Sequence, residues 1–114
     1  MSVSLKGIKE KCASFNAALG LTAGKPVAVA ANLTVAAASA GADIAGVAVN
    51  VDGGIAAVQL DGYVNLSYSG DTAPVVGYGI LVADGSGGVK VGLSGISRLI
   101  TDVDTTNKKV GFIL

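Results

Sequence analysis

The chain has 114 residues, the size of one ordinary domain, and its eight basic and eight acidic residues give a formal net charge of zero. Hydrophobic residues make up 51% of the sequence and charged residues only 14%, so charge alone cannot cover the surface. This balance offers no bulk attraction for nucleic acid, and three tyrosines, two phenylalanines and no tryptophan argue against a stacking platform for single strands.

The N-terminal stretch precedes the strand pattern and gathers basic residues. Lys6, Lys9 and Lys11 fall within the first dozen positions. They fit either a solvated arm or an arm that lies on the acidic surface of a partner and orders on docking, with these lysines as the candidate contacts. The stretch lacks the apolar run of a signal peptide, so we expect the chain to be made in a cytosol and kept there at first. We predict an arm over residues 1–11 and a single domain over residues 12–114.

Short apolar runs separated by turn signals fill the rest of the chain. Asp52-Gly53-Gly54 is a strong hairpin signal, and the glycine-rich residues 84–88 and polar residues 104–107 mark two further turns. The runs expected to form strands are residues 27–29, 44–51, 55–60, 63–68, 79–83, 89–91, 99–103 and 110–114. About eight to ten short strands at this spacing predict an all-β fold, a compact barrel or sandwich.

Two pairs of segments are similar to each other. Residues 24–30 align with residues 77–83, and residues 44–60 align without gaps with residues 98–114. The second alignment matches Val49 with Val103, and it matches Ala56, Val58 and Leu60 with Val110, Phe112 and Leu114. The similarity predicts two similar halves, which arise either from an ancient duplication or from two similar meanders that share one core.

Residue types that carry catalysis or bind metals are scarce. The sequence has no histidine and one cysteine, which argues against zinc sites, Ser-His-Asp triads and Cys-His dyads. Cys12 can form no internal disulfide. Without a histidine to activate it, we expect a small, half-buried residue on a strand. We therefore predict that the protein is not an enzyme and uses no cofactor.

One segment shares features with a calcium loop, whereas the other acidic residues are scattered singly. Asp102 and Asp104 have the spacing of the first calcium ligands, but Asn107 stands where glycine is expected and Ile113 where a glutamate is expected. We therefore predict a hairpin turn there, without a metal. The other aspartates fall at predicted turns, where aspartate caps its own backbone: Asp43, Asp52, Asp61, Asp71 and Asp84.

The low charge leaves two explanations for the surface open. Small polar residues and many of the 17 glycines cover it, or another protein covers part of it, since large uncharged patches usually mark interfaces. The longest uncharged stretch, residues 26–42, is interrupted by polar residues and glycine. A membrane-spanning helix needs about 20 mostly apolar residues. We therefore expect no membrane span.

Several segments together resemble the small capsid decoration, or cement, proteins of tailed bacteriophages. The resemblance lies in residues 24–29, 44–48, 77–83 and 110–114 and covers about residues 12–114, although residues 98–101 depart from the expected repeat. It implies a β-rich domain on the outer surface of the virion capsid that binds the major capsid protein and reinforces contacts between its subunits. It also implies a homo-oligomer, with a trimer favoured, made in the host cytoplasm, with neither nucleic acid nor membrane as a partner.

Two other classes of protein remain alternatives. The first is another phage structural part, such as a tail-tube or head-fibre subunit, although the long insertion loop expected of a tube protein is missing. The second is a non-viral β-barrel that binds a ligand or carries a modified lysine at a hairpin tip. Lys108 and Lys109 are the nearest candidates for such a lysine, but they lack the hydrophobic flanks of a carrier site.

Overall fold

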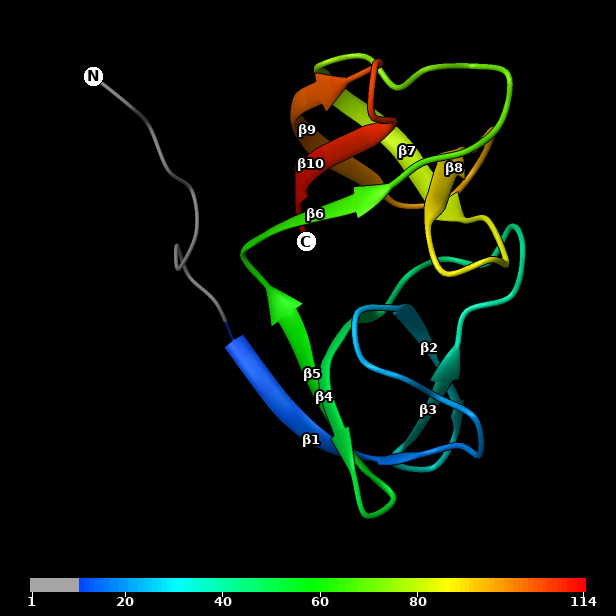
Figure 1. Cartoon of the computed structure of the whole chain (residues 1–114), viewed down its shortest axis with the longest axis vertical. Coiled ribbons are helices and arrows are strands. Elements are labelled where there is room, and N and C mark those ends of the chain that lie inside the picture. Colours follow the sequence, from blue (N-terminus) through cyan, green and yellow to red (C-terminus); the bar gives the residue numbers. More distant parts are fainter. Residues whose placement is uncertain (1–10) are drawn as a thin grey trace.

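The computed structural model describes residues 11–114, which form ten strands and no helix (Figure 1). The strands are β1 Lys11–Ala17, β2 Pro26–Ala31, β3 Thr34–Ala37, β4 Gly46–Asp52, β5 Ile55–Asp61, β6 Tyr63–Ser67, β7 Gly77–Ala83, β8 Val89–Val91, β9 Ser97–Asp104 and β10 Lys109–Ile113. The predicted all-β fold of about eight to ten short strands is confirmed. Within this range no helix has the length and hydropathy that crossing a membrane requires.

The first five strands form a closed barrel, the first unit, in the lower half of Figure 1. Its strand order is β1-β3-β2-β4-β5, and β1 closes the ring by pairing antiparallel with β5 and parallel with β3. Because successive side chains point to opposite faces of a strand, one set lines the interior. The interior side chains are mostly small: Leu21, Val27, Val35, Ala48, Ala56 and Val58.

The last five strands form the second unit, in the upper half of Figure 1. Their order, β6-β10-β9-β7-β8, leaves β6 and β8 as edges that touch at a single parallel bridge between Tyr68 and Val89. Larger side chains fill this core: Val64, Leu66, Tyr68, Leu81, Ala83, Val89, Ile100, Val110 and Phe112. Three buried residues of the first unit, Ala38, Ile44 and Val47, belong to the same cluster.

The two units share one topology. We match β1 to β5 of the first unit, in order, with β6 to β10 of the second. The closed ring of the first unit, written β3-β2-β4-β5-β1, then corresponds strand by strand to the order β8-β7-β9-β10-β6 of the second unit. The parallel pair Ala17–Val35 then becomes the bridge Tyr68–Val89. The same bulge recurs, because Val49 is skipped opposite β5 and Thr101 is skipped opposite β10. The predicted similarity of the halves is thus present in the strand pairing, and each half has its own hydrophobic cluster.

The strand pairing corrects parts of the sequence alignment. The matches of Ala56 with Val110 and of Val58 with Phe112 hold, but Val51 rather than Val49 is equivalent to Val103. The reason is the turn, which has two residues between Asp52 and Ile55 but four residues, 105–108, between Asp104 and Lys109. On β2 and β7 the alignment is one residue out in opposite directions at the two ends, because the pairing makes Pro26 equivalent to Tyr78 and Val29 to Ala83, so β7 has two more residues over this stretch.

Polar contacts reinforce the apolar junction between the units. Two side chains donate hydrogen bonds across the junction. Gln59 Nε2 donates to the Tyr63 carbonyl oxygen at 3.1 Å, and Arg98 Nη2 donates to the Ile44 carbonyl oxygen at 2.6 Å. Partial burial lowers the pKa of Arg98, while the nearby charge of Asp43 opposes this shift. The junction therefore fixes how the two units lie against each other, and surfaces built from both are well defined.

Candidate interaction surfaces

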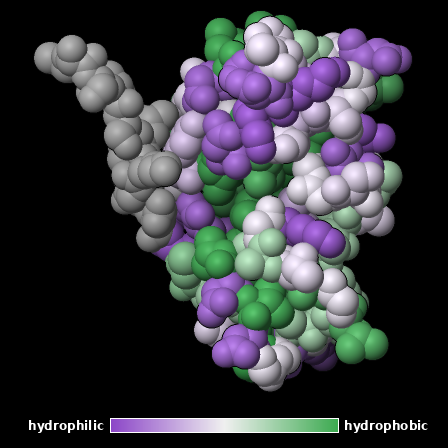
Figure 2. All heavy atoms as spheres, in the orientation of Figure 1, coloured by the Kyte–Doolittle hydropathy of each residue, from purple (hydrophilic) through white to green (hydrophobic). Residues whose placement is uncertain are grey.

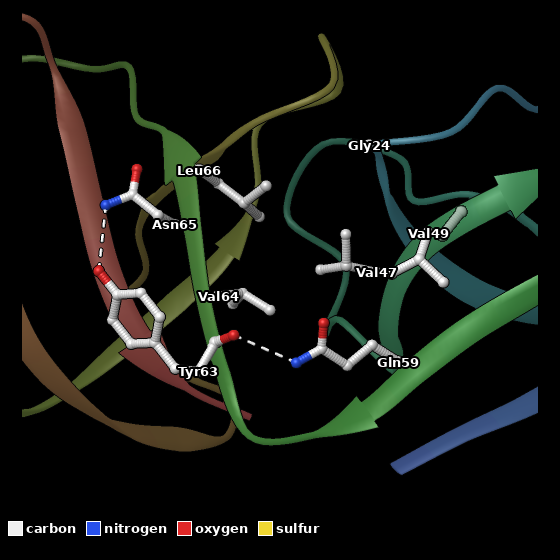
Figure 3. A pocket seen from close by; sticks show the side chains of 9 residues that line it. Gly24, Val47, Val49, Gln59, Tyr63, Val64, Asn65 and Leu66 are labelled. Carbon is white, nitrogen blue, oxygen red and sulfur yellow. Dashed lines mark hydrogen bonds between the residues drawn. The ribbon is translucent and has the colours of Figure 1, made fainter. Parts of the chain in front are cut away.

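A cleft of about 500 Å³ lies between the two units. Figure 3 shows Val64 and Leu66 of β6 pointing toward Val47 of β4, whereas Tyr63 and Asn65 point away. The cleft is lined by Gly24, Val47, Ala48, Val49, Gln59, Tyr63, Val64, Asn65 and Leu66, and none of these residues is charged. In Figure 2 hydrophobic atoms gather at the corresponding waist of the molecule. The cleft can accept apolar groups but holds no acid, base or nucleophile.

Gln59 is the one buried polar side chain among residues 11–114, with 7% of its surface exposed. Its Nε2 donates to the carbonyl oxygen of Asp61 at 3.0 Å. It also donates to the carbonyl oxygen of Tyr63 at 3.1 Å, the bond drawn in Figure 3. These bonds hold the kink where β5 passes into β6. Because an unsatisfied buried amide costs about 1–3 kcal/mol, this double contact explains how a glutamine is tolerated at the junction. Its role is structural.

The outer face of the second unit carries a row of four apolar side chains, which we call the outer row. Tyr78 on β7 lies directly opposite Leu99 on β9, Leu99 lies opposite Ile113 on β10, and Ile113 lies opposite Tyr63 on β6. Directly opposed residues of a sheet project from the same face. Tyr78 is 80% exposed and Leu99 37%, while Tyr63 and Ile113 are half-buried. Four neighbouring strands thus present one continuous apolar stripe.

A polar row borders the outer row. Tyr63 Oη donates to Asp102 Oδ1 at 3.0 Å and receives a hydrogen bond from Asn65 Nδ2 at 3.3 Å (Figure 3). Thr101 Oγ1 donates to Asp102 Oδ1 at 2.7 Å. Burial raises the pKa of Tyr63, and the neighbouring Asp102 carboxylate adds to the shift. The carboxylate therefore anchors the phenol and is not arranged as a general base.

Gly111 explains why this polar row can form. It lies between Asn65 and Asp102 on the middle strand of the row. A Cβ at this position would collide with the Asp102 carboxylate and with Tyr63 Oη. The missing side chain leaves the space in which the two groups meet. Glycine here permits a contact between side chains rather than a special backbone angle.

Two of the five predicted turn aspartates cap their own loops: Asp84 accepts from Ser86 and Gly88, and Asp61 accepts from the Gly62 N–H, whereas Asp43 accepts from the distant Ile96 N–H. Burial alone would raise the pKa of Asp84, but hydrogen bonds from the backbone N–H groups of Ser86 and Gly88 lower it overall. Asp104 accepts from Asn107 Nδ2 at 2.9 Å and from the Thr106 N–H at 3.0 Å, and these bonds lower its pKa. The segment expected to be a hairpin turn is therefore one.

The remaining candidate residues lie near the start of the chain. Lys6 and Lys9 fall outside the described residues, whereas Lys11 is the exposed first residue of β1, one position before the predicted domain start. Cys12 lies on β1 as predicted, but it is exposed and not half-buried. Its end of β1 is not covered by the second unit. Within residues 11–114 no group of three histidine, cysteine, aspartate or glutamate side chains could hold a metal ion.

Comparison of the sequence with protein-family models and with curated proteins yields no match.

Proposed function

We propose that this protein is a structural virion protein that binds the outer surface of a tailed-phage head and reinforces contacts between major capsid subunits. The observation that carries the proposal is the outer row, an exposed apolar stripe on a rigid sheet. Contiguous exposed apolar surface of this kind usually marks a protein interface. The sequence resemblance to decoration proteins supplies the class of partner.

The physical requirements of a cement protein fit this chain. Such a protein needs a contact that is repeated many times over a lattice, so that avidity adds to a modest affinity at each site. Any protein that binds the expanded shell alone stabilises that shell by mass action. Alanine and glycine at many positions keep exposed apolar groups small, which favours solubility of the unbound protein.

The N-terminal arm is a second contact in this proposal. Lys6, Lys9 and Lys11 would lie on an acidic part of the coat subunit and orient the docked protein. Lys11 is exposed at the start of β1, so its side chain is available for such a contact. A trimer around a threefold position of the lattice would present three arms and three outer rows together, which multiplies the avidity.

The test mixes purified chain with expanded, undecorated heads of the tailed phage whose genome carries the gene. Heads are pelleted, the bound chain is quantified, and the heads are then challenged with heat or a chelator. We expect saturable co-pelleting and sturdier heads, with weak binding to unexpanded heads as the matched control. A chain that stays in the supernatant and leaves the heads no sturdier would contradict the proposal. Tubes in negative stain would favour a tail part, and added mass on a lysine would favour a carrier domain.

A further inference from the structure

The equivalence of the two units singles out the outer row. In the first unit the positions equivalent to Tyr63, Ile113, Leu99 and Tyr78 are held by Cys12, Gln59, Val47 and Pro26. Cys12 lies opposite Gln59, Gln59 opposite Val47, and Val47 opposite Pro26. The side chains of Val47 and Gln59 are only 6% and 7% exposed, although neither belongs to the cluster that fills the interior of the first barrel. The second unit covers them: Val47 packs into its core, and Gln59 donates to the Tyr63 carbonyl. The middle of this row, Val47 and Gln59, is therefore a binding surface within the molecule, whereas Cys12 at its end is exposed.

Residues 11–114 contain no third unit to cover the equivalent surface of the second unit. Tyr78 occupies the position of the buried Pro26, and Leu99 occupies the position of the buried Val47. Ile113 takes the position of Gln59. Leu99 and Ile113 of the uncovered row are thus more apolar than the covered residues Val47 and Gln59 that they match, whereas a purely solvated face would be expected to be more polar.

The surroundings of the outer row have the composition of an interface. Val75 and Val76, 74% and 61% exposed, precede β7 and line a pocket together with Tyr78. Asn65 and Asp102 form a polar rim on the neighbouring row. An apolar centre that includes tyrosine, bordered by polar groups, is the usual arrangement of a protein interface. Tyr63 is held in place by Asp102, so part of the row is preorganised.

We infer that the outer row is the face that docks on the capsid, and that its occupant is an apolar, uncharged patch of the coat subunit. This inference rests on the proposed function and adds which face makes the contact. The size of the row favours a coat lattice over a second copy of the chain. Three strand spacings make it about 14 Å long. It therefore offers only a few hundred Å² at most, whereas a stable dimer buries roughly 800 Å² on each partner. A small contact suffices where the lattice repeats it.

The test compares three proteins in the head-binding assay: the wild type, the double variant Tyr78→Asn/Leu99→Asn, and the matched control Leu19→Ser. Leu19 is fully exposed on the first unit, so its replacement removes an apolar side chain away from the outer row. We expect the double variant to bind heads at least about tenfold more weakly, because truncated central interface residues commonly cost this much. The control should bind like the wild type. Far-ultraviolet circular dichroism and the thermal midpoint establish that all three proteins are folded.

The outcomes separate the inference from the proposed function. If the wild type fails to bind heads, the proposed function fails and the inference fails with it. If the wild type binds and the double variant binds equally well, the proposed function stands and the inference is overturned. Sedimentation equilibrium adds a further check. Unchanged oligomeric mass in the double variant supports a coat subunit as occupant, whereas loss of self-association would assign the row to a contact between copies.

Discussion

Replacement of Gly46 by alanine tests the close contact between β4 and β5 beside the unit junction. Gly46 begins β4, pairs with Val27 on β2, and is buried. A Cβ on Gly46 would collide with the carbonyl oxygen of Gln59 and lie 2.7 Å from Val58 Cγ1. The Gln59 carbonyl oxygen is a backbone atom of β5, so it cannot rotate away from the new Cβ as a side chain could. The substitution must therefore displace one strand against the other.

The expected loss of stability can be estimated and measured. Overpacking a well-packed core costs about 1–3 kcal/mol, and a clash with backbone belongs at the upper end, about 3 kcal/mol. With a urea dependence of about 1.5 kcal/mol per M, the unfolding midpoint should fall by about 2 M. Urea unfolding followed by far-ultraviolet circular dichroism measures this shift, because the described fold consists of strands and three tyrosines give a weak fluorescence signal.

Gly79→Ala is the matched control. Gly79 also lies in a strand, but a Cβ there would approach only the terminal Cδ1 of Ile100, at 3.2 Å, and that methyl group can move. We expect its free energy of unfolding to stay within about 1 kcal/mol of the wild type, since the lower chain entropy of alanine offsets part of the crowding. Equal midpoints for the two variants would refute the argument that the carbonyl of Gln59 limits how closely β4 approaches β5.

Three further predictions concern the core, the junction and acid stability. Phe112→Ala should lower the free energy of unfolding by about 3–5 kcal/mol, because this side chain is fully buried in the second unit, and a loss below 1 kcal/mol in urea unfolding would contradict that placement. Gln59→Leu removes both hydrogen bonds at the β5–β6 kink and should cost about 1–3 kcal/mol, whereas Gln59→Glu should cost more at pH 7 than at pH 4, where its carboxyl can protonate. The lowered pKa of Asp84 means that its stabilising contribution is present above the ordinary aspartate pKa, about 3.9, and is lost as the pH falls through the folded-state value. Asp84→Asn should therefore flatten the decline of the thermal midpoint below about pH 4, and an unchanged decline would show that other carboxyl groups govern it.

The sequence predicts the parts of this fold that depend on neighbouring residues. Asp52-Gly53-Gly54 is a turn because both glycines take positive φ, the Asp84 loop is a turn because its carboxylate accepts from the Ser86 and Gly88 N–H groups, and both appear where predicted. The matches of Ala56 with Val110 and of Val58 with Phe112 also hold, because these residues follow the turn. Before the turn the alignment fails by two residues. A gap-free comparison cannot detect that one turn is longer, since similar apolar residues recur at every second position.

The outer row could not be predicted from the sequence for a different reason. Its four residues are far apart along the chain, and they meet because the ladders place them opposite one another across four strands. Each of them, taken alone, resembles an ordinary strand residue. The exposure of Cys12 was missed in the same way, because Cys12 shares a face with the covered Gln59, and alternation along β1 does not say how far along that face the second unit reaches. Only the strand register and the position of the junction decide this.

The asymmetry between the units bears on whether copies of the chain would stack end to end. The second unit receives Val47 beside β6, where its ring is joined to β8 by a single bridge. The first unit has no such opening, because β1 pairs with both β3 and β5 and closes the barrel. The first unit of another copy therefore cannot cover the outer row in the way that the second unit covers Val47. Within residues 11–114 this asymmetry disfavours end-to-end stacking of copies through the outer row, which is consistent with the proposed contact to a different protein.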